Sequence, residues 1–377
     1  MRILIVAGEA SGDLHGSHLV KSFLKIRPDI EICGVGGEGM KEAGVEILFD
    51  AKDMGVVGGT EIIGKIGLFW NVYKRLSSEI KSDNYGAIIL IDYPTLNLRL
   101  AKIAKKRGIP VFYYISPQIW AWRRGRLKKI RRFVDKMLVI LPFEEAIYKK
   151  AGMDVEYVGH PFIDIVKPTM SKEEGYKRFG IEPNKKVIGL LPGSRKNEID
   201  SLLLTMVSAA KIIKSRIPHI QFILPVAYTI DKDYIVSKIK GDSLDIKIVE
   251  GYTYDVMNIS DFLILASGSA TLEAGLFGVP MVIVYKVNLL TYILGRILVM
   301  VRDKGLVNIV AGQRVVPELF QHKATPERIA SSAITAIEDE GYYRFVKENL
   351  LVIRNSLGKG GASERAALSI LRSLGSE

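Results

Sequence analysis

Residues 261–273 decide the fold, and they read Asp-Phe-Leu-Ile-Leu-Ala-Ser-Gly-Ser-Ala-Thr-Leu-Glu. The apolar run Phe262–Leu265 is typical of a strand buried in a parallel sheet. A turn of small residues follows, and the pattern after it predicts a helix. Free N–H groups at a helix start, with hydroxyl groups around them, can bind an anion such as a phosphate. An ordinary strand-to-helix turn capped by Ser269 explains the same segment equally well.

The same turn contains further features that suit a nucleotide diphosphate. Gly268 has no Cβ, so a phosphate could approach the backbone there. Glu273 follows about one helical turn later and could accept hydrogen bonds from a ribose diol. The candidate binding residues of this segment are Ser267, Gly268, Ser269, Ala270, Thr271 and Glu273.

A second segment repeats the pattern. The strand-like run Lys186–Leu191 ends in a small-residue turn containing Gly193, Ser194 and Arg195, and a helix is predicted next. Arginine can make two parallel hydrogen bonds to a phosphate. An arginine on a solvated loop is the common alternative. Two such turns in one half of the chain, one with an arginine, favour a nucleotide site.

Length and composition bound the class of protein. The chain has 377 residues, 48% of them apolar and 25% charged, which is typical of a soluble globular protein with two domains. The single cysteine, Cys33, excludes an internal disulfide framework and fits a reducing compartment. The run Met1–Ala7 reads as a first strand and not as a signal peptide. No apolar run reaches the roughly 18 residues that span a bilayer. No residue spacing indicates a metal or a cofactor.

Positive charge is concentrated in one segment. Residues 99–136 contain thirteen Lys and Arg and one acid, so this segment alone carries +12, the formal net charge of the whole chain. A helix predicted over Arg123–Arg132 could meet RNA, anionic lipid or phosphorylated substrates; a solvated basic helix is the simpler alternative. Trp120 and Trp122 precede it, and aromatic residues beside basic ones fit a membrane interface or a nucleic-acid platform equally well.

Strand-like runs alternate with helix-length stretches along the chain, which predicts βαβ units and parallel sheets. The pattern restarts after Pro168, so a domain boundary is expected there, and Thr325–Glu377 is expected to be helical without a further strand. The predicted strands are Ile3–Ala7, Glu31–Val35, Ala87–Ile91, Val111–Tyr114, Met137–Leu141, Val155–Val158, Lys186–Leu191, Gln221–Pro225, Lys247–Val249, Phe262–Leu265 and Met281–Tyr285.

Two apolar segments fit this alternation poorly. Met54–Tyr73 mixes glycines with large apolar residues, and glycine lowers helix stability by about 1 kcal/mol per residue, so an irregular or mobile piece is predicted. If exposed, it could enter a membrane surface through Ile62, Phe69 and Trp70; if buried, it is core. Val287–Val301 is predicted to be a buried helix, too short to span a bilayer.

Two motifs are open to misreading. Residues 34–39, Gly-Val-Gly-Gly-Glu-Gly, fit the dinucleotide-binding pattern literally, but they follow the second predicted strand and the match is weak. Asp231 and Asp233 resemble a pair of metal ligands, and a cap on the following helix explains them better.

Asp92 ends the apolar strand Ala87–Ile91. Ligands bind at the carboxyl ends of parallel strands, and a carboxylate there can act as a general base. A cap or turn residue ahead of Pro94 is the alternative.

Taken together, these segments resemble the lipid-A-disaccharide synthases, glycosyltransferases of the outer-membrane lipid pathway. The segments that carry the resemblance, in chain order, are Val6–Asp13 (Val-Ala-Gly-Glu-Ala-Ser-Gly-Asp), Ile91–Asp92 with Pro94 and Asn97, Tyr114–Arg123 (Tyr-Ile-Ser-Pro-Gln-Ile-Trp-Ala-Trp-Arg), Leu141–Glu144, Val158–Pro161, Leu191–Arg195, Ala266–Glu273, Val307–Gly312 and Val316–Leu319.

The resemblance implies an α/β protein of GT-B architecture, with two facing Rossmann-like domains and the site in the cleft. Residues 1–167 would bind the acceptor and face the membrane, and residues 168–345 would bind the UDP-sugar. Residues 346–377 would form helices that pack back on the first domain or on a partner subunit in a homodimer.

The family joins UDP-2,3-diacylglucosamine to 2,3-diacylglucosamine 1-phosphate, forms a β-1,6-linked disaccharide 1-phosphate with inversion, and releases UDP. By resemblance, Asp92, Arg195 and Asn308 fall on positions important for activity. Ser11 and His160 are further candidates for substrate contact. His160 lies near the predicted hinge, where a buried structural histidine is an equal alternative.

One departure from the family pattern concerns the acceptor side. The family commonly has Ala-Pro-Asp-Phe-Asn after the first aspartate, whereas this chain has Tyr-Pro-Thr-Leu-Asn at 93–97. The second carboxylate is therefore absent, with Thr95 in its place. This leaves Asp92 as the candidate base and bears on the acyl or sugar preference at the acceptor.

Acylated substrates imply a protein peripheral on the inner face of the cytoplasmic membrane. Two other functions remain open. A UDP-sugar 2-epimerase shares the architecture, but its soluble substrates would not need the apolar segment Met54–Tyr73. A basic RNA-binding protein could use residues 99–136, but that reading leaves the two nucleotide-type turns unexplained.

Overall fold

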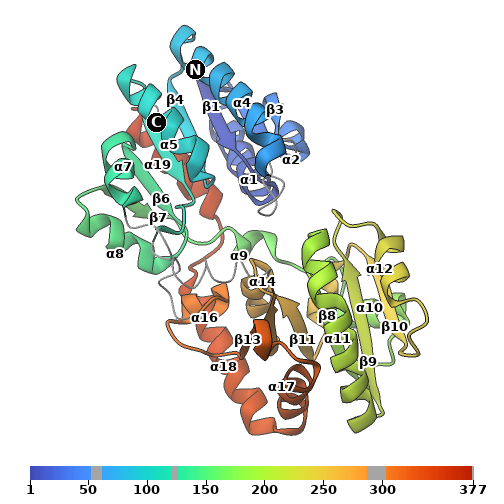
Figure 1. Ribbon diagram of the computed structural model, residues 1–377. Helices are drawn as coiled ribbons and strands as arrows, with labels where there is room; N and C mark the ends of the chain where they lie inside the picture. The colour runs from blue at the N-terminus through green and yellow to red at the C-terminus, as the bar shows by residue number, and fades with distance from the viewer. Residues whose placement is uncertain (52–61, 120–124, 287–302, 376–377) are drawn as a thin grey trace. The chain divides into compact units, whose positions relative to one another are not determined.

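The computed structural model describes residues 1–51, 62–119, 125–286 and 303–375 (Figure 1). It consists of two compact units, each with its own parallel sheet and helices. The first comprises Met1–Asp164 and Leu357–Glu377, and the second comprises the described residues within Ile165–Ile297 and Val301–Ser356. The chain thus crosses between the units after Asp164 and again after Ser356. The expected boundaries were after residue 167, from the sequence pattern, and after residue 345, from the family resemblance.

The first unit is built on a seven-stranded parallel sheet with the order β3-β2-β1-β4-β5-β6-β7. Its central strands are completely buried because helices cover both faces, which explains their continuous apolar runs. The strands are β1 (Arg2–Ala7), β2 (Glu31–Gly36), β3 (Glu46–Asp50), β4 (Ala87–Ile91), β5 (Val111–Tyr114), β6 (Lys136–Val139) and β7 (Asp154–Tyr157). The helices are α1 (Ala10–Ile26), α2 (Glu38–Glu42), α4 (Ile62–Ser82), α5 (Pro94–Lys106), α7 (Arg126–Phe133), α8 (Pro142–Lys150), α9 (Phe162–Ile165) and α19 (Ala362–Ser373).

The second unit is built on a six-stranded parallel sheet with the order β10-β9-β8-β11-β12-β13. The larger part of its core lies under α11 and α17, and a smaller part lies under α10 and α13. The strands are β8 (Lys186–Leu191), β9 (Ile220–Val226), β10 (Ile246–Glu250), β11 (Phe262–Ala266), β12 (Met281–Tyr285) and β13 (Glu318–Phe320). The helices are α10 (Lys172–Phe179), α11 (Lys196–Arg216), α12 (Lys232–Ile239), α13 (Thr253–Ile259), α14 (Ala270–Leu276), α16 (Leu306–Ala311), α17 (Pro326–Glu338) and α18 (Glu340–Ser356), with a short 3₁₀ turn at Gln321–Lys323.

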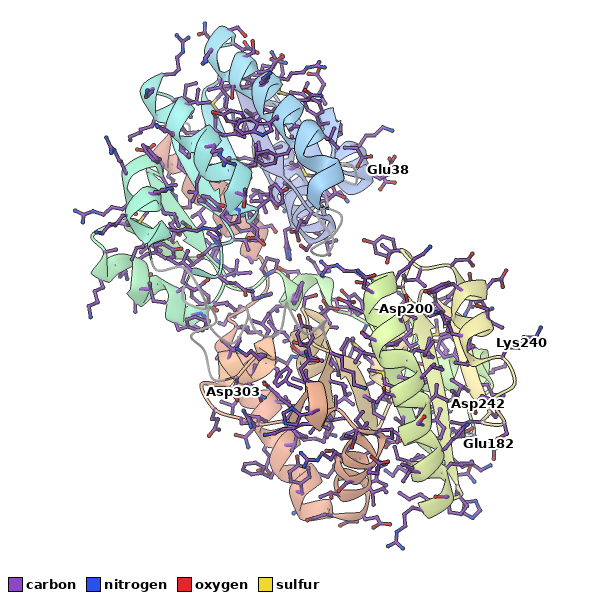
Figure 2. All side chains as sticks on the ribbon, in the orientation of Figure 1. Glu38, Glu182, Asp200, Lys240, Asp242 and Asp303 are labelled. Carbon is purple, nitrogen blue, oxygen red and sulfur yellow. The ribbon has the colours of Figure 1, made fainter. Side chains whose placement is uncertain are left out.

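Ion pairs brace the outer helices of the second unit. Asp200 on α11 accepts a 2.6 Å hydrogen bond from the Tyr234 hydroxyl and pairs with Lys238 at 2.6 Å, so it ties α11 to α12 (Figure 2). Asp231 caps α12 by accepting a 2.9 Å hydrogen bond from the Asp233 N–H. This confirms the predicted helix cap in place of a metal-binding pair.

The predicted irregularity of Met54–Tyr73 is wrong for its second half, where Ile62–Tyr73 is part of the regular helix α4. The helix buries Val72, Leu76 and Ile80 completely, and this 4-residue spacing holds one face against the sheet. Tertiary packing therefore outweighs the local cost of the glycines. Residues 52–61 and Val287–Val301 lie outside the described residues.

The glycine-rich motif 34–39 serves packing within the first unit. A Cβ on Gly34 would lie 1.8 Å from the Ile5 carbonyl oxygen on the neighbouring strand. The Asp13 carboxylate accepts hydrogen bonds from the N–H groups of Gly37 at 2.6 Å and Gly39 at 3.0 Å, and thereby anchors α2 to α1. These contacts account for the motif without a dinucleotide.

The last residues of the chain return to the first unit, where α19 packs against α1 (Figure 1). The Asp164 carboxylate accepts a 2.7 Å hydrogen bond from the Gly361 N–H. The Arg365 guanidinium donates to the carbonyl oxygens of Val158 and Lys359, both at 2.9 Å. The outgoing and returning segments are therefore bound together on the first unit. None of the described helices combines the length and the apolar character that a membrane span requires.

Candidate active site

Each sheet has one place where the strand order reverses, and both predicted sites lie there. In the first unit the reversal lies between β1 and β4, where Ala7 pairs with Ile91. In the second it lies between β8 and β11, where Leu191 pairs with Leu265. The crevice beyond the carboxyl ends of strands at such a point is the usual ligand site of an open α/β sheet.

Asp92 and Tyr93 form a strained turn at the first reversal. Both residues have left-handed backbone torsions, with φ of 42° and 40°. Such a conformation costs non-glycine residues on the order of 1 kcal/mol or more each, so the surroundings must hold it in place. The Asn97 side-chain amide donates to the carbonyl oxygens of Ile91 at 3.1 Å and Asp92 at 2.8 Å. The Tyr113 hydroxyl also donates to the Asp92 carbonyl oxygen.

The Asp92 carboxyl group has a raised pKa. Its burial, and secondarily the nearby Glu9 carboxylate, raise the pKa of Asp92 to about 6, against a weaker opposing hydrogen bond from the Tyr93 backbone. A group with this pKa can accept a proton near neutral pH. Asp92 is not a helix cap, because Tyr93 occupies the N-cap position of α5.

The Tyr93 side chain is held by Gly8, at the exit of β1. A Cβ on Gly8 would lie 2.4 Å from the Tyr93 ring, so only glycine leaves room for this aromatic side chain. Close packing of the two turns brings Glu9 near Asp92 and explains the effect of Glu9 on the Asp92 pKa.

Ser11 and His160 differ in their surroundings. Ser11 is exposed in the first turn of α1, beside the Gly8–Glu9 turn. His160 is 2% exposed, its Nδ1 accepts a 3.2 Å hydrogen bond from the Phe162 N–H, and its ring lies 4.6 Å from the Phe162 ring. Burial, followed by the nearby His15, lowers the pKa of His160 to about 3. These contacts are those of a neutral structural histidine.

At the second reversal, Glu198 organises the turn that contains Arg195. Its Oε2 accepts a 2.9 Å hydrogen bond from the Ser194 N–H, and its Oε1 lies 3.6 Å from Arg195 Nη1. Gly193 has φ of 123°, and a Cβ there would lie 2.2 Å from Glu198 Oε2. The fold therefore requires glycine at this position. Sequence reasoning missed Glu198, although its position three residues after Arg195 at a helix start is a usable signal.

The adjacent turn, 267–271, leaves space in front of its glycine. Gly268 is exposed, its φ is not positive, and no described atom lies within 4 Å of a Cβ built on it. The protein's own packing thus gives no reason for a glycine here. Ser269 occupies the N-cap position of α14, but its side chain caps no backbone N–H, so the capping explanation of this turn is wrong.

The hydroxyl and carboxyl groups behind this turn have distinct surroundings. Thr271 is completely buried, and its hydroxyl donates a 2.9 Å hydrogen bond to the Gly268 carbonyl oxygen, so it stabilises the turn itself. Burial raises the pKa of Glu273, and a hydrogen bond with Ser269 opposes that rise. Tyr254 lies close enough for the Glu273 charge, after burial, to raise the pKa of its hydroxyl. Sequence reasoning missed Tyr254, because no motif marks it.

Asn308, which the family resemblance places among the positions important for activity, is paired within the protein. It is 1% exposed, and its amide nitrogen donates to the Val316 carbonyl oxygen at 2.9 Å and to Glu318 Oε1 at 2.8 Å. Its amide oxygen accepts from the N–H groups of Val315 at 2.9 Å and Val316 at 3.0 Å. Both donors and both acceptor sites of the amide are used within the protein. These hydrogen bonds support the loop before β13, which Asp303 and Arg314 also brace through a 2.6 Å ion pair (Figure 2).

The predicted membrane-contact residues are described in part. Trp70 on α4 is 44% exposed and Phe69 is half-buried. The Arg99 guanidinium on α5 lies over both rings, 5.3 Å from the Phe69 centroid and 5.8 Å from that of Trp70. The side chain of Ile62, and all of Trp120 and Trp122, lie outside the described residues.

Comparison with known proteins identifies the family. A family model described as lipid-A-disaccharide synthetase matches residues 3–367. A lipid-A-disaccharide synthase of Syntrophus aciditrophicus is 47% identical over 370 residues, which cover 98% of this chain and 97% of that relative.

Solved structures show the fold. A UDP-GlcNAc 2-epimerase from Neisseria meningitidis, solved with UDP-GlcNAc bound, has a TM-score of 0.69 at 15% identity and covers 99% of this chain and 100% of its own. The glycotransferase of kitacinnamycin has a TM-score of 0.65 at 15% identity, with 99% of each chain covered. At such identities the likeness is one of fold alone, and it confirms the predicted α/β class of the GT-B type.

Nearly half of the aligned residues, over almost the full length, are identical to those of a lipid-A-disaccharide synthase. This identity favours that family over the epimerase and RNA-binding alternatives. The chain belongs to the lipid-A-disaccharide synthase family, and it has that family's glycosyltransferase activity in lipid A biosynthesis.

Proposed function

We propose that the protein transfers the sugar of UDP-2,3-diacylglucosamine to 2,3-diacylglucosamine 1-phosphate, forming a β-1,6-linked disaccharide 1-phosphate and UDP with inversion. The observation that carries the proposal is the Asp92 carboxyl group. It lies in a strained turn at a strand-order reversal, and its pKa is raised to about 6. A group of this kind suits a general base that activates a hydroxyl.

The reaction is a single in-line displacement. Asp92 accepts the proton of the acceptor 6-hydroxyl as its oxygen bonds to the anomeric carbon of the donor. The bond from that carbon to the diphosphate breaks on the opposite face, and UDP leaves with the electron pair. One bond forms and one breaks on opposite faces of the carbon, so the anomeric configuration inverts.

The second unit binds the donor in this proposal. Arg195, with the N–H groups of residues 267–271, would stabilise the charge that develops on the leaving diphosphate. Preorganised donors of this type contribute roughly 3 kcal/mol each. Gly193 and Ser194 shape the same turn, and Glu273 would hold the ribose diol. Glu198 lies near Arg195 Nη1 and favours one orientation of its guanidinium group.

Acyl chains on both substrates require access to a membrane surface. In our proposal, Met54–Tyr73, Trp120, Trp122 and the basic stretch Arg123–Arg132 make that contact at the inner face of the cytoplasmic membrane. The exposed Trp70 beside Arg99 supports it, because aromatic and cationic side chains together suit an anionic interface. Phe69→Ser with Trp70→Ser should weaken binding to phosphatidylglycerol vesicles, and unchanged binding would reject this surface. The homodimer expected from the sequence stays a prediction.

The test uses purified protein in mixed micelles with both lipid substrates and EDTA, with UDP and the disaccharide 1-phosphate followed by mass spectrometry. Acceptor-dependent formation of both products is the expected result. UDP release without disaccharide would indicate hydrolysis or another acceptor. An epimerised UDP-sugar formed without acceptor would overturn the proposal.

A further inference from the structure

A cavity of about 690 Å³ lies between α5 and α7 in the first unit. Its volume is in the range of small-molecule sites. Cationic side chains line both of its walls. They are Arg99 and Lys102 from α5, and Arg126, Lys128, Lys129 and Arg132 from α7.

The charge of this cavity is not balanced by its walls. None of the described residues that line it is acidic. Within the described chain, Lys102, Lys128 and Lys129 form no ion pair, although other surface lysines such as Lys105 do. Like charges on two facing walls repel one another, so a bound anion would stabilise the arrangement. Several cations converging from two sides suit a phosphate group in particular.

The cavity also has an apolar part, which narrows the kind of ligand. Leu98 and Phe133 line it, and the Arg132 guanidinium lies 5.6 Å from the centroid of the Phe133 ring. Phe133 is half-buried and covered in this way, so it is a poor stacking platform for a nucleic-acid base. A phosphate attached to an apolar body fits these walls better than RNA does.

The position of the cavity links it to the candidate base. Pro94 and Thr95 are among the residues that line it, and they follow directly on the Asp92–Tyr93 turn. Three peptide steps of about 3.8 Å keep the Cα atoms of Asp92 and Thr95 within about 11 Å. Thr95 lies in the first turn of α5, where backbone N–H groups have no partner within the helix.

We propose that this cavity is the subsite for the 1-phosphate of the acceptor lipid. The inference rests on the proposed function and deepens it. The 1-phosphate of the acceptor is on C1 and its 6-hydroxyl is on the substituent of C5, so the two groups are separate positions on one sugar ring. A phosphate in the cavity would leave the 6-hydroxyl for Asp92, and the apolar walls would contact the start of an acyl chain.

The test compares two acceptors at saturating donor, 2,3-diacylglucosamine 1-phosphate and the same lipid without its phosphate. The measured quantity is the ratio of their kcat/KM values. The wild-type protein should prefer the phosphorylated acceptor. In Lys102→Gln with Lys129→Gln this ratio should fall about tenfold or more, since hydrogen bonds to charged groups contribute at least that factor. Lys129 also lies in the proposed membrane-contact stretch, but a loss of membrane contact would lower the kcat/KM of both lipid acceptors alike and would cancel from the ratio.

The matched control is Lys106→Gln with Arg107→Gln. It removes the same charge from exposed positions at the far end of α5, outside the cavity. Its ratio should equal that of the wild type. Because both acceptors are measured on one preparation, a partly misfolded fraction cancels from the ratio.

Four results would overturn the inference. The first is a wild-type protein without preference for the phosphorylated acceptor. The second is an equal fall of the ratio in the control pair, which would indicate overall electrostatics. The third is an unchanged ratio in Lys102→Gln with Lys129→Gln together with lost binding to phosphatidylglycerol vesicles, which would assign the cavity to membrane lipid. The fourth is an unchanged ratio together with lost binding to RNA, which would assign the cavity to nucleic acid. Wild-type protein that makes disaccharide from neither acceptor would instead reject the proposed function.

Discussion

The side-chain amide of Asn97 donates a 2.8 Å hydrogen bond to the main-chain carbonyl oxygen of Asp92. Both Asn97 and the second donor to this oxygen, Tyr113, are completely buried. Burial first, and the nearby Asp92 charge second, raise the pKa of Tyr113, so its hydroxyl stays protonated and can donate. The carboxyl group of Asp92 is thus oriented through its own backbone before any substrate binds.

Tyr113→Phe tests this support. The change removes one donor to the Asp92 carbonyl oxygen and keeps the ring, so kcat should fall about two- to tenfold with little change in donor KM. Tyr148→Phe is the control, because it removes another buried hydroxyl, whose 2.6 Å hydrogen bond goes to Ser116. Equal losses of kcat in the two variants would mean that Tyr113 acts only through general stability.

Activity should depend on the ionisation of Asp92. Its pKa of about 6 in the ligand-free protein places the acid limb of the kcat/KM profile near pH 6, and Asp92→Asn should remove that limb together with a hundredfold or more of kcat/KM. A wild-type profile that stays flat down to pH 5 would contradict the assignment.

Ionisation of Asp92 should raise activity but lower the stability of the folded protein. The folded-state pKa lies above the ordinary value of 3.8, so the stabilising contribution of Asp92 is complete below about pH 4 and is lost as the pH rises through 6. Asp92→Asn should therefore raise the thermal midpoint of the first unit at pH 7 relative to wild type, with a smaller difference at pH 4. Calorimetry at the two values measures both.

Arg195→Ala should lower kcat about a hundredfold and weaken UDP binding far less, because the leaving diphosphate gains charge only as the bond breaks. Turnover and UDP calorimetry on the same preparation separate the two effects. Arg216→Ala is the control, since Arg216 ends the same helix and pairs with Glu338 at 3.2 Å on the surface. A loss confined to KM would remove Arg195 from transition-state stabilisation.

Two glycines should respond differently to the same change. Gly193→Ala places a Cβ 2.2 Å from Glu198 Oε2 and should lower the thermal midpoint clearly. Gly268→Ala meets no described atom within 4 Å, so the midpoint should hold while UDP binding weakens. Normal UDP binding by Gly268→Ala would show that no ligand comes close to that backbone.

Asn308→Ala should act through folding. It leaves several buried partners without a hydrogen bond, at a cost of about 1–3 kcal/mol for each group that water cannot reach. The expected result is a lower thermal midpoint together with reduced activity. A variant with an unchanged midpoint and no turnover would support direct contact with the substrate after all.

The sequence predicts the sheets well because parallel strands buried on both faces leave continuous apolar runs. Each of the predicted strands corresponds to an observed one, with ends that differ by a few residues. It misses β3, an edge strand whose residues are mostly half-exposed, and β13, which has three residues. Both are too short or too mixed for a periodic signal.

The sequence likewise predicts only a part of the candidate site. It indicates Asp92, Arg195 and the two turns, because each of them follows a strand and this is a local property of the sequence. Glu198 and Tyr254 were not selected, because their importance comes from which atoms surround them. The full internal pairing of Asn308 likewise depends on residues 315–318, which lie in another part of the chain from its helix.

The Asp164–Gly361 hydrogen bond and the contacts of Arg365 have a consequence for biosynthesis. In chain order, the second unit is an insertion within the first, placed between Asp164 and Leu357. A ribosome therefore releases the whole of the inserted unit before it releases α19, and the host unit can be completed only from the last residues made. Truncating the chain at one position therefore cannot yield both units intact. To obtain the first unit alone, the inserted unit must be deleted and Asp164 joined to Leu357. Hydrogen bonds already hold the segments around these two residues together.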